Sequence, residues 1–134
     1  DRAPGLGLVS HGADVVRSYL HAFATGDPHA IAAFVTDDFV NEHTSALGSS
    51  CTGRDDYLAR LPDFLAAFPG LRYHVERVVV DGDHAAAAYR MTATSEGHPV
   101  DLRGVMVFEL DGGRIARRTD YWDSLTYLRQ VGQA

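Results

Sequence analysis

The amino-acid sequence predicts an α+β fold, with helices in the first half of the chain packed against a curved antiparallel sheet formed by the second half. Apolar residues recur at helical spacing in several segments up to residue 68. After residue 71, strand-like segments are separated by the turn signals Asp81-Gly82, Glu96-Gly97 and Asp111-Gly112, which is typical of consecutive β-hairpins. Long strands twist and coil, so we expect a cone-shaped sheet that carries the N-terminal helices on its concave face and encloses a cavity.

The first helix is expected to begin at residue 14 and to end near Gly26, because its apolar residues repeat with helical spacing. Tyr19 lies on the predicted buried face and is its one polar-tipped side chain. Residues 1–12 precede this pattern and are expected to form a flexible tail. Residues 1–134 are too few for a second domain of ordinary size, so we expect a single domain.

Two further helices are expected before the main sheet. Asp27 and Pro28 have the residue types of an N-cap and a first helical position, which predicts a short second helix. A third helix is expected over 54–68, where apolar residues form a continuous stripe. Pro62 lies inside this stripe and lacks a backbone N–H, so we expect a kink or break there.

The strands are bounded by turn dipeptides. A short strand is expected over 39–43, followed by a polar loop over 44–53. Asp123 is placed to cap a closing helix after the last strand. Four longer strands, joined as an antiparallel meander, are expected over 71–80, 84–95, 98–110 and 114–122.

Composition limits the classes of function. The formal net charge is −6 and the arginines are scattered, so the chain lacks the basic patch that nucleic acid or an anionic membrane requires. The single cysteine, Cys51, excludes an intramolecular disulfide, and no stretch has the length and apolarity of a membrane span. We expect a soluble, cytoplasmic protein. All twelve basic residues are arginine, which excludes lysine-based covalent chemistry.

No cofactor or metal is expected. The sequence lacks a phosphate loop, a His-Glu-x-x-His helix and paired cysteines. Its histidines are dispersed without the spacing of metal ligands. Candidate chemistry must therefore come from polar side chains on segments that otherwise have core character.

Asp120 is the first such candidate, because it lies near the end of a core strand and shares a face with Arg118 and Trp122. On the strand over 84–95, Arg90 and Thr92 share a face. A buried guanidinium needs a carboxylate partner, and we expect Asp120 to be the partner of Arg90 in the interior. A structural ion pair and two surface residues are the alternatives.

Three more polar residues complete the candidate set. Asn41 and His43 point the same way from the short strand, and Tyr19 lies on the first helix. Each also has a simple structural interpretation. His43 could be an exposed strand end, Asn41 could cap the following loop, and Tyr19 could be a core tyrosine with a satisfied hydroxyl.

Together, several segments resemble the nuclear transport factor two-like superfamily. They are Tyr19, the Gly26-Asp27 pair, 34–40, the helix after Gly53, the meander and the terminal Gly-Arg-Ile-x-x-x-x-Asp-Tyr-Trp-Asp. Within the superfamily, the chain is most similar to SnoaL-like polyketide cyclases, limonene epoxide hydrolases and ketosteroid isomerases. The resemblance covers 14–132 and implies a cystatin-like α+β roll. This fold carries many reactions and also non-enzymatic binders, so the reaction needs separate argument.

The resemblance implies roles for two groups of residues. Asp120 matches the acid/base aspartate of the cyclases, and Arg90 matches the arginine of the epoxide hydrolases. Thr92 stands where those hydrolases have another aspartate. Met106 stands where the isomerases have a second acidic donor and the cyclases a histidine, and it becomes part of the expected substrate site with Thr92 and Trp122.

The first helix and the short strand supply the remaining implied roles. Asn41 and His43 match the positions that hold the attacking water in the hydrolases. His43 also matches the general base of the isomerases, and Tyr19 matches their oxyanion donor. We expect Asn41 and Tyr19 to contact substrate, and Asp120, His43 and Arg90 to be catalytic.

The leading hypothesis is a cofactor-free SnoaL-like enzyme that cyclises or isomerises a small polyketide- or terpenoid-like metabolite by general acid/base catalysis. An epoxide hydrolase and a non-catalytic ligand-binding module are the alternatives. We also expect a homodimer formed through the outer face of the sheet. The apolar residues assigned to that face are Tyr89, Met91, Val105, Val107 and Tyr121.

Overall fold

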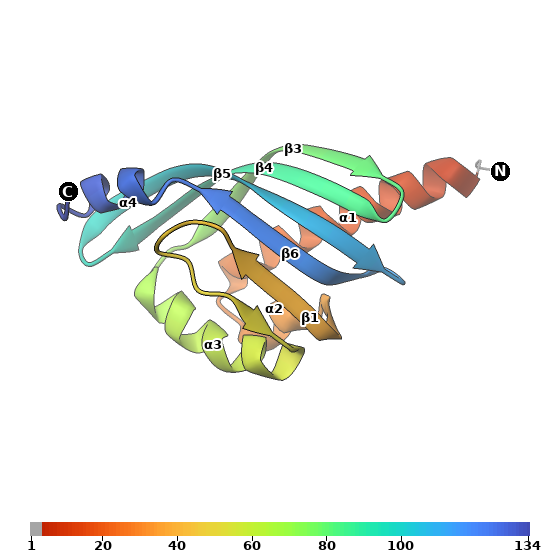
Figure 1. The fold of residues 1–134 in the computed structure, drawn as a ribbon, viewed down its shortest axis with the longest axis horizontal. Helices are drawn as coiled ribbons and strands as arrows, with labels where there is room; N and C mark the ends of the chain where they lie inside the picture. The colour runs from red at the N-terminus through yellow and green to blue at the C-terminus, as the bar shows by residue number, and fades with distance from the viewer. Residues whose placement is uncertain (1–3) are drawn as a thin grey trace.

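The computed structural model describes residues 4–134, with side chains from residue 11 onward, and contains an open six-stranded curved sheet with helices (Figure 1). This confirms the predicted α+β class. The helices are α1 (Pro4–Ala22), α2 (Pro28–Ala32), α3 (Arg54–Ala67) and α4 (Ser124–Gln130), with a 3-10 turn η1 (Phe23–Thr25) after α1. The strands are β1 (Val35–His43), β2 (Cys51–Thr52), β3 (Arg72–Asp81), β4 (His84–Ser95), β5 (His98–Asp111) and β6 (Arg114–Trp122).

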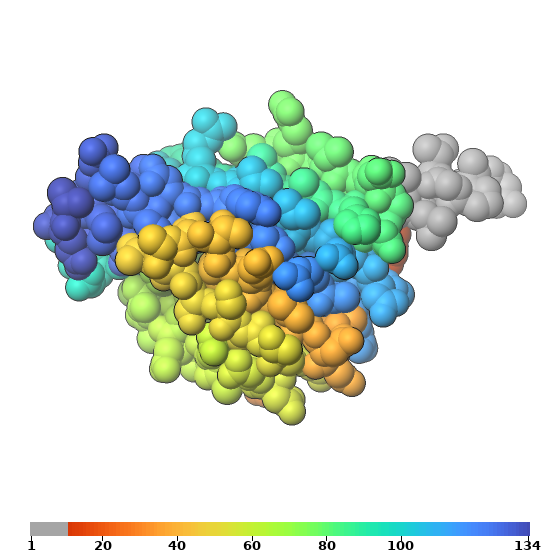
Figure 2. Space-filling view, in the orientation of Figure 1, coloured from red at the N-terminus to blue at the C-terminus, as the bar shows by residue number. Residues whose placement is uncertain are grey.

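The sheet has the order β2-β1-β6-β5-β4-β3. Strands β3 to β6 form the predicted antiparallel meander, whereas β1 runs parallel to β6. The parallel register places Asn41 beside Arg118 and His43 beside Asp120. Strand β2 lies inside the segment expected to be a loop and pairs with β1. Figure 2 shows the orange segment that contains β1 lying beside the blue segment that contains β6.

The helix boundaries follow local capping chemistry. The Asp27 carboxylate accepts from the backbone N–H of His29 at 3.0 Å, and Asp123 accepts from Leu125 at 2.9 Å, as expected for N-caps. Helix α3 continues through Pro62. None of the helices within residues 4–134 is long and apolar enough to cross a membrane.

The start of α1 differs from the expectation. It begins at Pro4 instead of residue 14, so residues 4–12 of the expected flexible tail belong to the helix. Residues 1–3 of that tail lie outside the described residues. Helix α1 packs on β3, α3 packs on β1 and α4 packs on β5.

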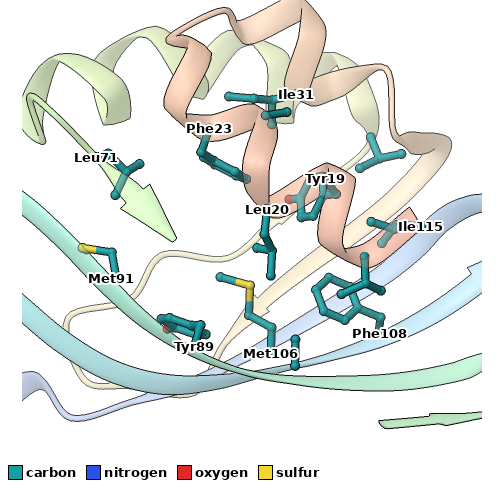
Figure 3. Packing of buried hydrophobic residues seen from close by; sticks show 14 of the residues in the cluster. Tyr19, Leu20, Phe23, Ile31, Leu71, Tyr89, Met91, Met106, Phe108 and Ile115 are labelled. Carbon is teal, nitrogen blue, oxygen red and sulfur yellow. The ribbon is translucent and has the colours of Figure 1, made fainter. Parts of the chain in front are cut away.

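The core lies between α1 and the inner face of the sheet. Tyr89, Met91 and Met106 rise from the sheet toward the helix segment that carries Leu20 and Phe23 (Figure 3). The expected placement of Tyr89 and Met91 on the outer face is therefore wrong. Both are buried, and they share the inner face of β4 with Ala85 and Ala87. The other strand face consequently turns outward.

Candidate active site

A cavity of about 590 Å³ opens between the inner face of the sheet, α3, α4 and the loop after β1. Its walls are mainly apolar and include eight aromatic side chains, and β1 and β6 contribute Asn41, Arg118 and Asp120 at one end. The aromatic lining residues are Phe23, Tyr57, Phe64, Phe68, Tyr73, Tyr89, Trp122 and Tyr127. An apolar cavity with a few convergent polar groups is the usual form of a small-molecule site.

Asp120 and Arg118 form the polar centre of this cavity. Arg118 Nε donates to Asp120 Oδ1 at 2.7 Å and Nη2 donates to Oδ2 at 2.8 Å, which makes a bidentate pair. The two residues are only 2% and 4% exposed, respectively. They lie two positions apart on β6, so strand alternation directs both side chains to the same face. Because both charges are buried, each requires the other for compensation.

Two tyrosines contact the remaining edge of the guanidinium. Arg118 Nη1 donates to the Tyr19 hydroxyl at 2.7 Å and lies 3.4 Å from the Tyr57 hydroxyl. The two hydroxyls are also hydrogen-bonded to each other. Burial raises the pKa of Tyr57 well above its ordinary value, and burial also raises the pKa of Tyr19, although Arg118 opposes both shifts. Both phenols are therefore protonated at neutral pH.

Asn41 and His43 approach Asp120 from β1. Asn41 Nδ2 donates to Asp120 Oδ1 at 3.0 Å and to the backbone carbonyl of Arg118 at 3.2 Å. His43 Nδ1 lies 3.9 Å from Asp120 Oδ2, beyond hydrogen-bond distance. Among the described residues, His43 Nδ1 is the one buried side-chain nitrogen or oxygen atom without a hydrogen-bond partner. A buried, unpartnered ring nitrogen beside a carboxylate is unusual in a purely structural role.

The environment sets the charges of Asp120 and His43. Burial alone would raise the pKa of the Asp120 carboxyl, but the adjacent Arg118, assisted by His43 and Asn41, holds the pKa below its ordinary value. Burial lowers the pKa of His43, Arg118 lowers it further, and Asp120 only partly offsets this. At neutral pH the site therefore contains a carboxylate anion and a neutral imidazole.

The loop after β1 packs closely on His43. A Cβ atom at Gly48 would lie 2.3 Å from His43 Cβ and 3.1 Å from Nδ1, so a larger residue could not occupy this position without displacement. The loop is attached to β6 by the Thr44 hydroxyl, which donates to the Asp120 carbonyl at 2.7 Å, and by a hydrogen bond between Ser45 and the Trp122 carbonyl. Gly48 thereby allows the loop to shield Nδ1 from solvent.

The expected pairing of Arg90 with Asp120 is wrong. Arg90 lies on the outer face of β4, where Nε and Nη2 donate to the Asp101 carboxylate at 2.8 and 2.6 Å. Thr92 lies on the same outer face and hydrogen-bonds with His74 at 3.0 Å, so it is also outside the cavity. Both exposed pairs satisfy their polar groups without burial, which explains why the outer face is favoured for them.

The remaining predicted site residues divide into two groups. Asn41, His43, Asp120 and Trp122 line the cavity. Tyr19 and Met106 have no exposed surface and are absent from the cavity wall. Tyr19 lies behind Arg118, and Met106 belongs to the core opposite Asp120 in the β5–β6 register.

Arg118 and Tyr57, which contact each other at the polar centre of the cavity, are absent from the predicted site. Arg118 was recognised only as a neighbour of Asp120 on the same face, although that alternation was sufficient to propose their pairing. Tyr57 lies in the apolar stripe of the third helix, and no local feature of the sequence distinguishes it from a core tyrosine. Tyr57 and Arg118 are 61 residues apart in the sequence and come into contact only in the folded chain.

The family model for the SnoaL-like domain matches residues 16–118, which is most of the chain. The chain belongs to the SnoaL-like domain family. Comparison of this SnoaL-like protein with curated protein sequences gave no match.

Solved structures confirm the expected fold resemblance. A hypothetical protein with a ketosteroid isomerase-like fold from Catenulispora acidiphila, in complex with trimethylamine, superposes with a TM-score of 0.83 at 19% identity, over 90% of this chain and 94% of that chain. A candidate SnoaL-like polyketide cyclase from Jannaschia gives 0.79 at 20% identity, over 100% and 98%. An LEH-like epoxide hydrolase from M. tuberculosis gives 0.79 at 23% identity, over 92% and 94%.

Proposed function

We propose that this SnoaL-like protein is an enzyme that removes a proton from a small, largely apolar, oxygenated substrate and so promotes cyclisation or isomerisation through an enolate. His43 is the general base, and Asp120 is the fixed anion beside it. One observation carries the proposal: the buried Nδ1 of His43 lacks a partner and lies 3.9 Å from Asp120 Oδ2 at the polar end of an apolar cavity.

The environment of His43 suits a base. Its pKa is lowered by burial, so the ring is neutral at neutral pH and has a nitrogen lone pair available. Asp120 is the nearest anion to Nδ1, which favours the tautomer with the proton on Nδ1 and the lone pair on Nε2. When the ring accepts a proton, the Asp120 charge stabilises the imidazolium that forms.

This assignment changes the role expected for Asp120. A carboxylate held by a bidentate buried arginine is a poor proton acceptor at neutral pH because its pKa is lowered. Asp120 therefore acts through its charge, and Arg118 and Asn41 fix its orientation. The aromatic walls supply apolar contacts for the rest of the substrate.

The comparisons support the same class of reaction. The family model is that of the SnoaL-like domain, and one similar solved structure is described as a candidate polyketide cyclase. A non-catalytic binding module remains the rival from another class. That rival predicts no connected acid and base in the cavity, whereas here His43 and Asp120 converge from neighbouring strands.

Epoxide opening is a second candidate, favoured by a specific contact. Asn41 Nδ2 donates to Asp120 Oδ1 at 3.0 Å, and the oxygen atoms of this amide–carboxylate pair can accept hydrogen bonds from a water molecule and orient it. An LEH-like epoxide hydrolase is among the similar structures. Thr92 stands where the epoxide hydrolases have another aspartate. It faces outward, so this position does not contribute to the cavity.

The two chemistries can be tested with simple probes. We expect the protein to accelerate exchange of the α-protons of 2-tetralone in D₂O, followed by NMR, and His43→Ala to lose about a hundredfold to ten-thousandfold of that rate. Arg90→Ala, which changes only an exposed pair on the outer face, is the matched control and should retain the wild-type rate.

Hydrolysis of cyclohexene oxide in ¹⁸O-labelled water, measured by mass spectrometry, tests the epoxide alternative. Diol formation that requires Asp120, without any ketone exchange, would replace the enolate proposal with epoxide opening. An absence of both reactions, together with binding of either probe in the cavity, would favour the binding module.

A further inference from the structure

In the Arg118–Tyr19–Tyr57 cluster, the direction of one hydrogen bond determines which tyrosine hydroxyl can donate to a ligand. Arg118 Nη1 donates to the Tyr19 hydroxyl at 2.7 Å, and the two tyrosine hydroxyls are 2.5 Å apart. Either hydroxyl could be the donor in that second bond. The choice decides which tyrosine has a proton left for another acceptor.

The donors and acceptors available to the three groups determine the direction of this hydrogen bond. A guanidinium only donates, and each tyrosine hydroxyl has one proton to donate. Tyr19 has no exposed surface, and its hydroxyl contacts only Arg118 and Tyr57 among the described residues. If Tyr57 donated to Tyr19, the Tyr19 proton would be buried without an acceptor, which is unfavourable. Tyr19 therefore donates to Tyr57.

This direction leaves the proton of Tyr57 available. The Tyr57 oxygen accepts from Tyr19 and lies 3.4 Å from Arg118 Nη1, and neither neighbour can accept in return. Tyr57 is also a cavity-lining residue, whereas Tyr19 is not. We propose that Tyr57 donates its hydroxyl hydrogen bond to an oxygen atom of the substrate, with Tyr19 and Arg118 as positioning residues behind it.

The inference rests on the proposed function for its chemical step and narrows the substrate to an enolisable ketone or related carbonyl compound. His43 removes the proton from the carbon next to the carbonyl, and the electron pair of that C–H bond becomes the C=C bond of the enolate. The carbonyl π electrons move to oxygen, where the hydrogen bond from Tyr57 stabilises the developing negative charge. The proton returns from His43 to the new carbon position or is released to water.

The cluster is suited to this role because it is already oriented. Arg118 is fixed by its bidentate bond to Asp120, and Tyr19 is fixed in the core, so Tyr57 need not reorganise when charge develops. Successive hydrogen bonds that begin at a cation also polarise one another, which strengthens the last donor in the chain. Burial raises the pKa of Tyr57, so the phenol keeps its proton.

Binding of an oxyanion probe tests the proposal without requiring turnover. The probe is 4-nitrophenolate, at a pH where it is fully ionised, and nitrobenzene is the neutral ligand of similar shape. We expect the wild-type protein to prefer the anion, and Tyr57→Phe to weaken anion binding about tenfold to a hundredfold while nitrobenzene binding is unchanged. His43→Ala serves as a control for any contribution of the imidazole to anion binding.

Tyr19→Phe distinguishes the two hydrogen-bond directions. If Tyr19 donates to Tyr57, this variant leaves the Tyr57 proton available and binds the anion as well as wild type or a few-fold more weakly. If Tyr57 donates to Tyr19, the variant releases the Tyr57 proton and binds the anion more tightly, while Tyr57→Phe has no effect. That second pattern would overturn the proposal, as would a wild-type protein that binds 4-nitrophenolate no better than nitrobenzene.

The binding test and the exchange test fail independently. Loss of anion binding in Tyr57→Phe, in a protein that does not exchange ketone protons, would support the donor assignment and contradict the enolate reaction. Normal exchange in Tyr57→Phe, with a rate equal to wild type, would contradict the donor assignment and leave His43 as the base. Thermal unfolding of each phenylalanine variant checks that the fold is retained.

Discussion

Asp120 and Arg118 are both nearly fully buried, so the charge of each depends on the other. Asp120→Asn leaves a buried guanidinium facing a neutral amide. We expect a loss of about 3–5 kcal/mol in the free energy of unfolding, measured by chemical denaturation, because an unpaired buried charge is strongly destabilising. Replacing both partners in Arg118→Met/Asp120→Asn should cost less than the sum of the two single variants.

Asp101→Asn is the matched control for that experiment. It breaks the exposed pair with Arg90 on the outer face and should change the unfolding free energy little, because solvent screens exposed charges. An Asp120→Asn protein as stable as the Asp101→Asn protein would show that Arg118 is compensated by other groups.

His43 makes both stability and activity depend on pH. Its pKa in the folded protein is lowered from the ordinary value of 6.5, so the fold favours the neutral ring. This contribution to stability is present above pH 6.5 and is lost as the pH falls through the lowered folded pKa. The α-proton exchange rate should rise with pH through the same lowered pKa and then remain level through neutral pH.

The measurement is the unfolding free energy of wild type and His43→Gln across the acidic range. The Asp120 carboxyl, whose pKa is held below its ordinary value, is present in both proteins, so the difference between the two pH profiles reports the contribution of His43. An identical pH dependence in the two proteins would contradict the assignment of a lowered pKa to His43.

At the scale of the elements, local sequence predicted most of the meander. Two-residue turns that contain glycine, at 82–83, 96–97 and 112–113, join its strands, and β4 (His84–Ser95) and β6 (Arg114–Trp122) have the expected bounds. The same local information could not orient β4. Its run of four alanines at 85–88 lacks the alternation of apolar and polar residues that distinguishes the two faces, so the faces of Tyr89 and Arg90 were exchanged.

The candidate site was only partly predictable because it depends on pairing between distant strands. Asp120 could be recognised from its place on a core strand, and Arg118 shares its face by simple alternation. The parallel pairing of β1 with β6, which brings Asn41 and His43 to this carboxylate, spans more than 70 residues and has no local sequence pattern. Asp101 likewise satisfies Arg90 only through the β4–β5 register.

At the scale of the whole molecule, the outer face of the sheet carries an apolar patch. Val105, Val107 and Tyr121 are 37%, 36% and 49% exposed, and the register places Val105 beside Tyr121 and Val107 beside Ala86. Exposed ion pairs surround them, including Arg117 with Glu42 and Glu109, and Arg103 with Glu76. An apolar centre with a charged rim is typical of a protein interface.

We therefore expect two copies of the chain to associate through this outer face, even though Tyr89 and Met91 do not contribute to it. Sedimentation at micromolar concentration should show a dimer. Val107→Glu should give a monomer, because a carboxylate at the centre of the patch would be buried without a partner. Ala66→Glu, on the exposed side of α3, is the control and should remain a dimer.

A wild-type protein that sediments as a monomer under these conditions would show that the patch serves another purpose. The cavity opens on the opposite side of the sheet, so ligand affinity should be the same in the Val107→Glu monomer as in the wild-type dimer.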